Sequence, residues 1–241
     1  MYKNKKVSLC LPCRNEGAHL KEVVSRVPKF VDEIIVISNN SKDDTVKVAK
    51  KLKLKALEDN RTINGIGYGF AHMTGIENAT GDIIVGADGD ATYPIEELDK
   101  IIDILLNDKL DFISCNRYPV QDGTKIPFKL RLGVWLLNTE VRVLYGKKIN
   151  DILSGMWVFR KSVSNELRLS MGEWNLSPQI KINAATSPNV KFAEYSIGQH
   201  QRLGESHQKY FQTGLSHAIW ILQNRFGQSP EKAIDPINES I

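Results

Sequence analysis

The sequence predicts an α/β fold with a mainly parallel central sheet flanked by helices. Short runs of β-branched apolar residues, such as 34–37 and 83–87, have the composition of strands buried on both faces. Segments with helical spacing of apolar residues separate these runs, an alternation that is typical of βαβ units. Polar turns rich in Asp, Asn and Gly follow several runs, at the strand ends where open α/β sheets bind their ligands.

In the first half, each predicted strand is a short apolar run that ends at a polar turn. These strands are expected at residues 7–11, 33–38, 54–57, 83–87 and 112–115. The intervening segments 18–27, 42–52, 65–78 and 95–106 are expected to be helices. The last of them has apolar residues on one face and begins with Pro94 and two acids, which suit a first helical turn. This half therefore has the organisation of a nucleotide-binding layer.

The second half is less regular. Residues 119–127 are expected to form a loop and 128–144 a long helix that is apolar on nearly every side, so it should be buried or meet a membrane. A strand at 157–159, a helix at 177–185, a strand at 190–197 and a polar loop at 199–208 follow. An amphipathic helix at 211–226 precedes a polar tail, 227–241.

Composition limits the compartment and the class of partner. A net charge of +4 permits an anionic substrate or a membrane surface but does not argue for nucleic acid. Three cysteines predict no disulfide framework, which fits a reducing compartment. No apolar stretch reaches the roughly 18 residues of a membrane-spanning helix. We therefore expect a cytoplasmic protein, with a peripheral position at the cytoplasmic membrane face as the open alternative.

An Asp-x-Asp pair follows the predicted strand 83–87. Asp88 and Asp90 lie at the carboxyl end of this strand, and two carboxylates so placed suit Mg²⁺ or Mn²⁺ shared with substrate phosphates. A solvated turn explains the pair alone equally well. An EF-hand is excluded because Tyr93 occupies the position that needs glycine. A dinucleotide fingerprint beginning at Gly65 is excluded because its third glycine is Phe70.

Taken together, the motifs resemble those of family 2 glycosyltransferases of GT-A fold, most closely the polyprenyl-phosphate branch typified by dolichyl-phosphate mannose synthase. The resemblance spans about residues 7–226. The motifs that carry it, in the family's order, are 11–16, 34–45, 75–82, 88–94, Asn116-Arg117, 151–159 and 202–206. It implies one domain over 1–226, with a nucleotide-sugar-binding half at 1–117 and an acceptor half with amphipathic helices at 118–226.

The resemblance also implies roles for individual residues on the donor side. The nucleotide sugar would be held by Pro12, Arg14, Glu16, Asn39, Asp88, Gly89, Arg202 and Ser206. Asp88, together with Asp90, matches the metal-binding acids, and Gly89 would allow close approach of the ribose. One departure stands out: Ser38 occupies a position that is usually acidic in the family, which leaves the identity of the base open.

On the acceptor side, Asp151 matches the acid that faces the acceptor, and we expect it to be catalytic together with Asp90. Arg117 and Arg131 resemble the arginines that hold the acceptor phosphate. Outside the resemblance, Asp151 could be a capping acid and the arginines part of a solvated surface. A hydroxyl acceptor would require Asp151 to take a proton, whereas a phosphate acceptor is already anionic.

The implied function is inverting, metal-dependent transfer of a hexosyl-type group from a nucleotide-diphospho-sugar to a polyprenyl phosphate. One alternative is a glycosyltransferase with a saccharide hydroxyl acceptor in surface-polysaccharide assembly. Another is a catalytically silent protein that only binds nucleotide sugars, which the Ser38 departure keeps open. The expected partners are therefore the donor, one of these acceptors and, for the lipid, a membrane surface, with Mg²⁺ or Mn²⁺ as cofactor.

Overall fold

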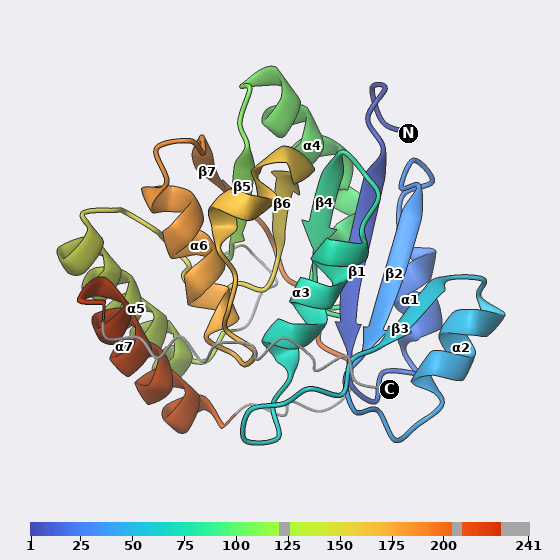
Figure 1. Cartoon of the computed structure of the whole chain (residues 1–241), viewed down its shortest axis with the longest axis horizontal. Helices are drawn as coiled ribbons and strands as arrows, with labels where there is room; N and C mark the ends of the chain where they lie inside the picture. The colour runs from blue at the N-terminus through green and yellow to red at the C-terminus, as the bar shows by residue number, and fades with distance from the viewer. Residues whose placement is uncertain (121–125, 204–208, 228–241) are drawn as a thin grey trace, which may run out of the picture.

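The computed structural model describes residues 1–120, 126–203 and 209–227, and its centre is one seven-stranded sheet of order β3-β2-β1-β4-β6-β5-β7 (Figure 1). The strands are β1 (Val7–Cys13), β2 (Glu33–Ser38), β3 (Lys55–Glu58), β4 (Ile83–Gly86), β5 (Phe112–Asn116), β6 (Trp157–Arg160) and β7 (Phe192–Ser196). All pairings are parallel except those of β6, which runs antiparallel to β4 and β5. The predicted mainly parallel α/β sheet is confirmed.

Helices cover both faces of the sheet. They are α1 (Leu20–Ser25), α2 (Thr45–Lys51), α3 (Tyr68–Asn78), α4 (Leu98–Asn107), α5 (Phe128–Tyr145), α6 (Leu176–Thr186) and α7 (Tyr210–Arg225), with 3₁₀ segments at Ile95–Glu97 and Lys161–Leu167. One buried cluster joins α1, α2 and α4 to the sheet, and a second joins α3 and α6 to it. A third cluster joins α5 to α7 beside the sheet (Figure 1).

The reversed direction of β6 decides where the site forms. Because Gly86 at the end of β4 pairs with Trp157 at the start of β6, the segment that enters β6 lies beside the segment that leaves β4. The 151–155 segment is thereby brought against the Asp88–Asp90 loop, although more than sixty residues separate them in sequence. If β6 ran parallel to β4, these two segments would lie at opposite ends of the strands.

Several predicted boundaries are wrong. β1 continues to Cys13, so Pro12 belongs to the strand and not to the following loop. The helix expected after residue 41 begins only at Thr45, because the Asp43 carboxylate accepts the backbone N–H groups of Thr45 (3.0 Å) and Gly17 (2.9 Å). Those bonds hold the 39–44 turn against the first loop and delay the helix.

The long helix α5 is neither fully buried nor fully exposed. Val134, Leu137 and Val141 are buried, and the last two pack with residues of α7, whereas Trp135 and Leu136 are 60% and 54% exposed. Its apolar residues on two sides therefore divide between a packed face and an open one. In the described part of the chain, neither α5 nor any other helix is long and apolar enough to cross a bilayer.

Candidate active site

The two acids at the end of β4 lie close together in a loop with little access to water. Asp90 is buried, and its Oδ1 accepts the Thr92 backbone N–H at 3.0 Å. Asp88 is half-buried and its Oδ1 accepts the Tyr68 phenol at 3.1 Å. Burial, and then the neighbouring Asp90 carboxylate, raise the pKa of Asp88 to about 7. A divalent cation would relieve this repulsion, so the oxygen donors present fit Mg²⁺ or Mn²⁺.

Residues 202–203 lie across this loop. Arg202 Nη1 is 2.9 Å from Asp90 Oδ2, and the Leu203 N–H donates to the Asp90 carbonyl at 3.0 Å. The structure thus brings Arg202 to the acids, as the resemblance implies. A guanidinium on Asp90 also means that a metal ion would have to share that carboxylate with it. Ser206 lies outside the described residues.

Gly89 is required by packing at the end of β1. A Cβ on Gly89 would lie 2.4 Å from Cys13 Sγ and 3.0 Å from the Pro12 carbonyl. The Gly89 N–H donates to that same carbonyl at 3.2 Å. The close approach at this glycine is therefore to β1, a contact that the sequence alone does not reveal.

The first loop contributes one buried acid and one partly exposed arginine. Glu16 is buried, and its Oε2 has no hydrogen-bond partner among the described residues. Burial, followed by the charge of Asp90, raises the pKa of Glu16 to about 7. Arg14 donates from Nη1 to the Gly65 carbonyl at 2.8 Å, which fixes it beside the glycine-rich loop. Glu16 is thus close enough to the acid pair for their negative charges to raise its pKa.

Asn39, which the resemblance assigns to the nucleotide sugar, contacts the backbone of a neighbouring turn. Its amide is buried and donates to the backbone carbonyls of Asp59 and Arg61, the latter at 3.1 Å. The Asp59 carboxylate in turn binds Arg61 and the Thr74 hydroxyl. Asn39 therefore holds the turn after β3. The Asp59 N–H in that turn donates to the Ser38 carbonyl at 3.0 Å.

Arg117 and Asp151 form a buried, bidentate ion pair. Arg117 Nε lies 2.6 Å from Asp151 Oδ2, and Nη2 lies 2.9 Å from Oδ1. Burial alone would raise the pKa of Asp151, but the Arg117 guanidinium holds it below its usual value. A fully buried carboxylate that binds a guanidinium at both oxygens is poorly placed to take a proton from a substrate. Asp151 instead fixes Arg117 and the loop that carries it.

The 151–155 segment connects this ion pair to the acid loop. A Cβ on Gly155 would lie 2.8 Å from the Tyr68 phenol and 2.9 Å from the Asp88 carboxylate. Beneath the segment, the fully buried Lys181 donates to the carbonyls of Asp151 and Ser154. Burial lowers the pKa of Lys181 to about 7. The segment is thus held from both sides.

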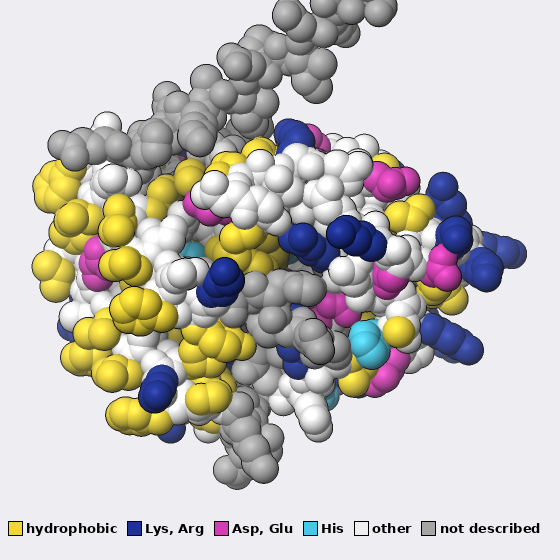
Figure 2. Space-filling model, turned by 90° about the horizontal axis from the view of Figure 1, so that it is seen from below, with side chains coloured by type: hydrophobic (Ala, Val, Ile, Leu, Met, Phe, Trp, Pro, Cys, Tyr) yellow, Lys and Arg dark blue, Asp and Glu magenta, His cyan; other side chains and the backbone are white. Residues whose placement is uncertain are grey.

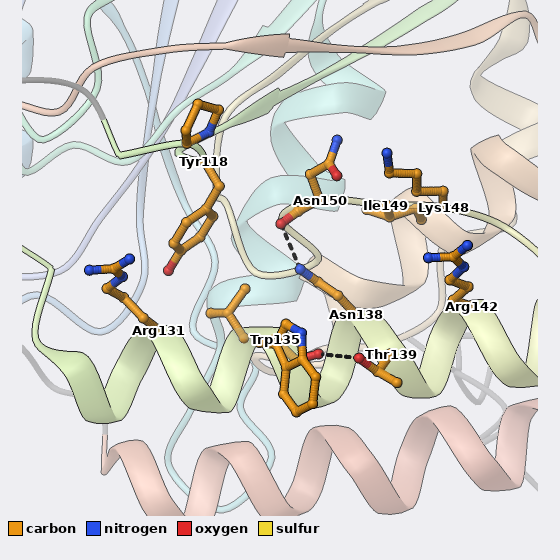
Figure 3. A pocket seen from close by; sticks show the side chains of 11 residues that line it. Tyr118, Arg131, Trp135, Asn138, Thr139, Arg142, Lys148, Ile149 and Asn150 are labelled. Carbon is orange, nitrogen blue, oxygen red and sulfur yellow. Dashed lines mark hydrogen bonds between the residues drawn. The ribbon is translucent and has the colours of Figure 1, made fainter.

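A cavity of about 380 Å³ opens at Asn150, just where this segment begins (Figure 3). It is lined by Tyr118, Pro119, Arg131, Val134, Trp135, Asn138, Thr139, Arg142, Lys148, Ile149 and Asn150. Tyr118 and Asn150 directly follow and precede Arg117 and Asp151 in sequence, so the cavity adjoins the ion pair. Arg131 therefore lines the cavity. Arg117 is not among the lining residues, and its guanidinium is bound by Asp151.

Sequence reasoning missed Tyr68 and Lys181. Tyr68 lies within the glycine-rich segment 65–69, whose sequence gives no sign of a contact with Asp88. That contact depends on the packing of α3. Lys181 had a detectable signal, because it is the only charged residue of α6, in which nine residues are buried. A lone lysine in such a helix indicates a buried cation with specific acceptors.

Known structures confirm the GT-A fold. Glucosyl-3-phosphoglycerate synthase from Mycobacterium tuberculosis, solved with Mn²⁺, uridine diphosphate and glucosyl-3-phosphoglycerate, matches with a TM-score of 0.70 and 18% identity. The match covers 93% of this chain and 81% of that one.

Curated relatives include the low-salt glycan biosynthesis hexosyltransferase of Haloferax volcanii, 26% identical over 92% of this chain. Dolichol-phosphate mannosyltransferase of Pyrococcus furiosus is 28% identical over 83% of this chain, and a UDP-N-acetylglucosamine–dolichyl-phosphate N-acetylglucosaminyltransferase of Methanococcus voltae is 25% identical over 81%. The chain spans 54%, 58% and 90% of the length of these three proteins, respectively. The glycosyl transferase family 2 model matches residues 8–168, and the chain belongs to that family.

Proposed function

We propose that the protein transfers a sugar from a nucleotide-diphospho-sugar to a polyprenyl phosphate, with inversion at the anomeric carbon. The observation that carries this proposal is the position of the cavity. It is lined by three cations and no acid, and the chain leads from it directly to the Asp88–Asp90 loop, because Asn150 lines the cavity and a Cβ on Gly155 would lie 2.9 Å from the Asp88 carboxylate. A donor diphosphate on one side and an acceptor phosphate on the other would meet at the 151–155 segment. The names of the dolichyl-phosphate transferases among the relatives agree with that acceptor.

On the donor side, Asp88 and Asp90 would hold Mg²⁺ or Mn²⁺. Such an ion stabilises the negative charge that builds on the leaving diphosphate oxygen. The crowding of the two carboxylates supports this role, as does the Mn²⁺ in the solved synthase. Arg202, already at Asp90, lies where its guanidinium would contact a diphosphate bound at the same loop.

On the acceptor side, a phosphate needs no general base. Its oxygen is already anionic, so it can attack the anomeric carbon without giving up a proton first. The burial of Asp151 and its two bonds to Arg117 agree with such an acceptor, because a saccharide hydroxyl would require an accessible base. Arg131, which forms no ion pair with any described acid, would bind the acceptor phosphate at the cavity.

The proposed lipid acceptor also requires contact with a membrane, and an apolar surface is available for it. Side chains of α5 and α7 that are exposed form this lipid-facing surface: Phe128, Leu132, Trp135, Leu136, Val143, Tyr210, Phe211, Leu215, Ile219, Leu222 and Phe226. Hydrophobic side chains gather on the corresponding side of the molecule in Figure 2. We propose that this surface rests in the interface of the cytoplasmic membrane face.

A transfer assay with matched acceptors tests the proposal. The protein would be incubated with a panel of nucleotide-diphospho-sugars, Mn²⁺ and either a short-chain polyprenyl phosphate or the polyprenol that lacks the phosphate. We expect a glycosylated lipid with the phosphate alone. Transfer to the polyprenol or to a saccharide would replace the proposed acceptor. Binding of donor without turnover on any acceptor would favour the silent-protein alternative.

A further inference from the structure

The cavity beside Asp151 has a second cationic end that the proposed acceptor leaves unused. Arg131 lies near one end of it, and Arg142 lies with Lys148 at the other (Figure 3). The two arginines are eleven residues apart on α5, which corresponds to about 16 Å along the helix axis. Trp135 and Asn138 lie between them in Figure 3. One phosphate group bound at Arg131 would not reach the Arg142 end.

The cations at this second end have no protein partner within the described residues. No acid of these residues lies within ion-pair distance of Arg142 or Lys148, and none lines the cavity. Arg142 lies in the last turn of α5, where the helix carries a partial negative charge of about one half. Two full positive charges exceed that value, so the end of the cavity remains positive.

The backbone around Lys148 is held in place beside α5. Asn138 of α5 donates to the Asn150 carbonyl and accepts the Ile152 N–H at 3.1 Å. Ile149 is buried, and the Asn150 N–H donates to the Glu194 carboxylate at 2.9 Å. The Glu194 carboxylate is thereby engaged by backbone groups, and the backbone at Lys148 is kept beside the last turns of α5.

From this geometry we infer that Arg142 and Lys148 form a second phosphate-binding site, separate from the one at Arg131. A guanidinium and an ammonium on one side of an open cavity are the groups with which proteins bind phosphate. Arg142 lies next to the exposed Val143 on the lipid-facing surface. The phosphate would therefore be a phospholipid headgroup, whose acyl chains extend over that surface. The lipid origin rests on the proposed function, whereas the site itself does not.

Binding of a soluble short-chain phosphatidate tests the site. Dihexanoyl phosphatidate, inorganic phosphate and dihexanoyl phosphatidylcholine would be titrated while tryptophan fluorescence is read, since Trp135 is exposed and lines the cavity. The variant is Arg142→Gln/Lys148→Gln. Its control is Lys129→Gln/Lys147→Gln, which removes the same charge from exposed residues of the same region that do not line the cavity.

We expect the wild type and the control to bind phosphatidate with affinities within about twofold of each other, and the variant to bind about thirtyfold more weakly. Phosphatidate binding more tightly than inorganic phosphate would identify a lipid headgroup as the ligand, and equal affinities would identify free phosphate. Equal affinities of the variant and the wild type for phosphatidate would contradict a phosphate-binding site at Arg142 and Lys148. These measurements need no nucleotide sugar, so a failure of sugar transfer would leave their outcome unchanged.

Discussion

The two sides of the 151–155 segment have opposite charge and opposite construction. On the donor side, the acids come from one loop that Gly89 packs against β1, and Asp90 is buried while Asp88 is half-buried. On the acceptor side, cations come from α5 and the turn after it, and they line an open cavity. Under the proposed function, the Asp88–Asp90 loop would hold a metal and a diphosphate where water has little access. The acceptor side is suited to receive a ligand from outside.

The largest effect should come from breaking the donor side. Asp90→Asn is expected to lower the transfer rate by at least about a hundredfold, because it removes one strong electrostatic stabiliser of the leaving group. Chelation with EDTA should abolish transfer, and Mn²⁺ should restore it. Asp99→Asn, at an exposed acid of α4, serves as the control and should retain the rate. Full activity in chelator would contradict a metal at the acid pair.

The 151–155 segment rests on the buried Lys181, whose pKa should make the stability of the protein depend on pH. The folded protein releases the Lys181 proton near pH 7, whereas the unfolded chain keeps it to about pH 10.4. Since the unfolded state binds more protons above pH 7, the free energy of unfolding should rise there, by up to about 1.4 kcal/mol per pH unit.

Denaturant unfolding between pH 7 and pH 9 measures this dependence. Lys181→Met should reduce the slope of unfolding free energy against pH relative to the wild type, while Lys191→Met, at an exposed position, should not. An identical slope in all three proteins would mean that Lys181 keeps its proton when buried.

A smaller effect is expected at the acceptor side. Arg131→Gln should raise the KM for polyprenyl phosphate about tenfold, because one charge-assisted hydrogen bond at an exposed site is lost. The KM for the nucleotide sugar should stay the same, since Arg131 lines the cavity and not the acid loop. Lys129→Gln is the matched control. Equal changes in both KM values would argue against separate donor and acceptor sides.

The smallest effect should come from Tyr68, which contacts the acid loop from α3. Tyr68→Phe removes the hydrogen bond to Asp88 and leaves the ring packing, so the metal concentration needed for half-maximal transfer should rise about fivefold. The exposed Tyr210→Phe should leave it unchanged. If Tyr68→Phe leaves the metal concentration for half-maximal transfer unchanged, the Tyr68 phenol is not needed to position Asp88.

The donor side could be predicted in large part from sequence, and the acceptor side could not. Asp88 and Asp90 are two residues apart and follow a recognisable buried strand, so the local pattern is enough to place them. The fold class was also predictable, because the parallel strands alternate with helices along the chain. The antiparallel insertion of β6 depends on long-range packing, and the sequence carries no local sign of it.

Burial also changed the interpretation of particular residues. Asp151 and Arg117 were each recognised, but their mutual ion pair depends on the turn from β5 and on the segment before β6. The sequence also gives no sign that the Asn39 amide donates to the backbone of the turn after β3. The exposed and buried faces of α5 could not be separated by its apolar pattern, because that pattern covers nearly the whole helix.

The most direct test follows the phosphorus atoms during one reaction. With a nucleotide-diphospho-sugar, Mn²⁺ and a short-chain polyprenyl phosphate, ³¹P NMR should show the lipid monoester becoming a diester. Nucleoside diphosphate should appear in equal amount. This result would show that the lipid phosphate is the acceptor. Release of nucleoside diphosphate with an unchanged lipid monoester would contradict transfer to phosphate.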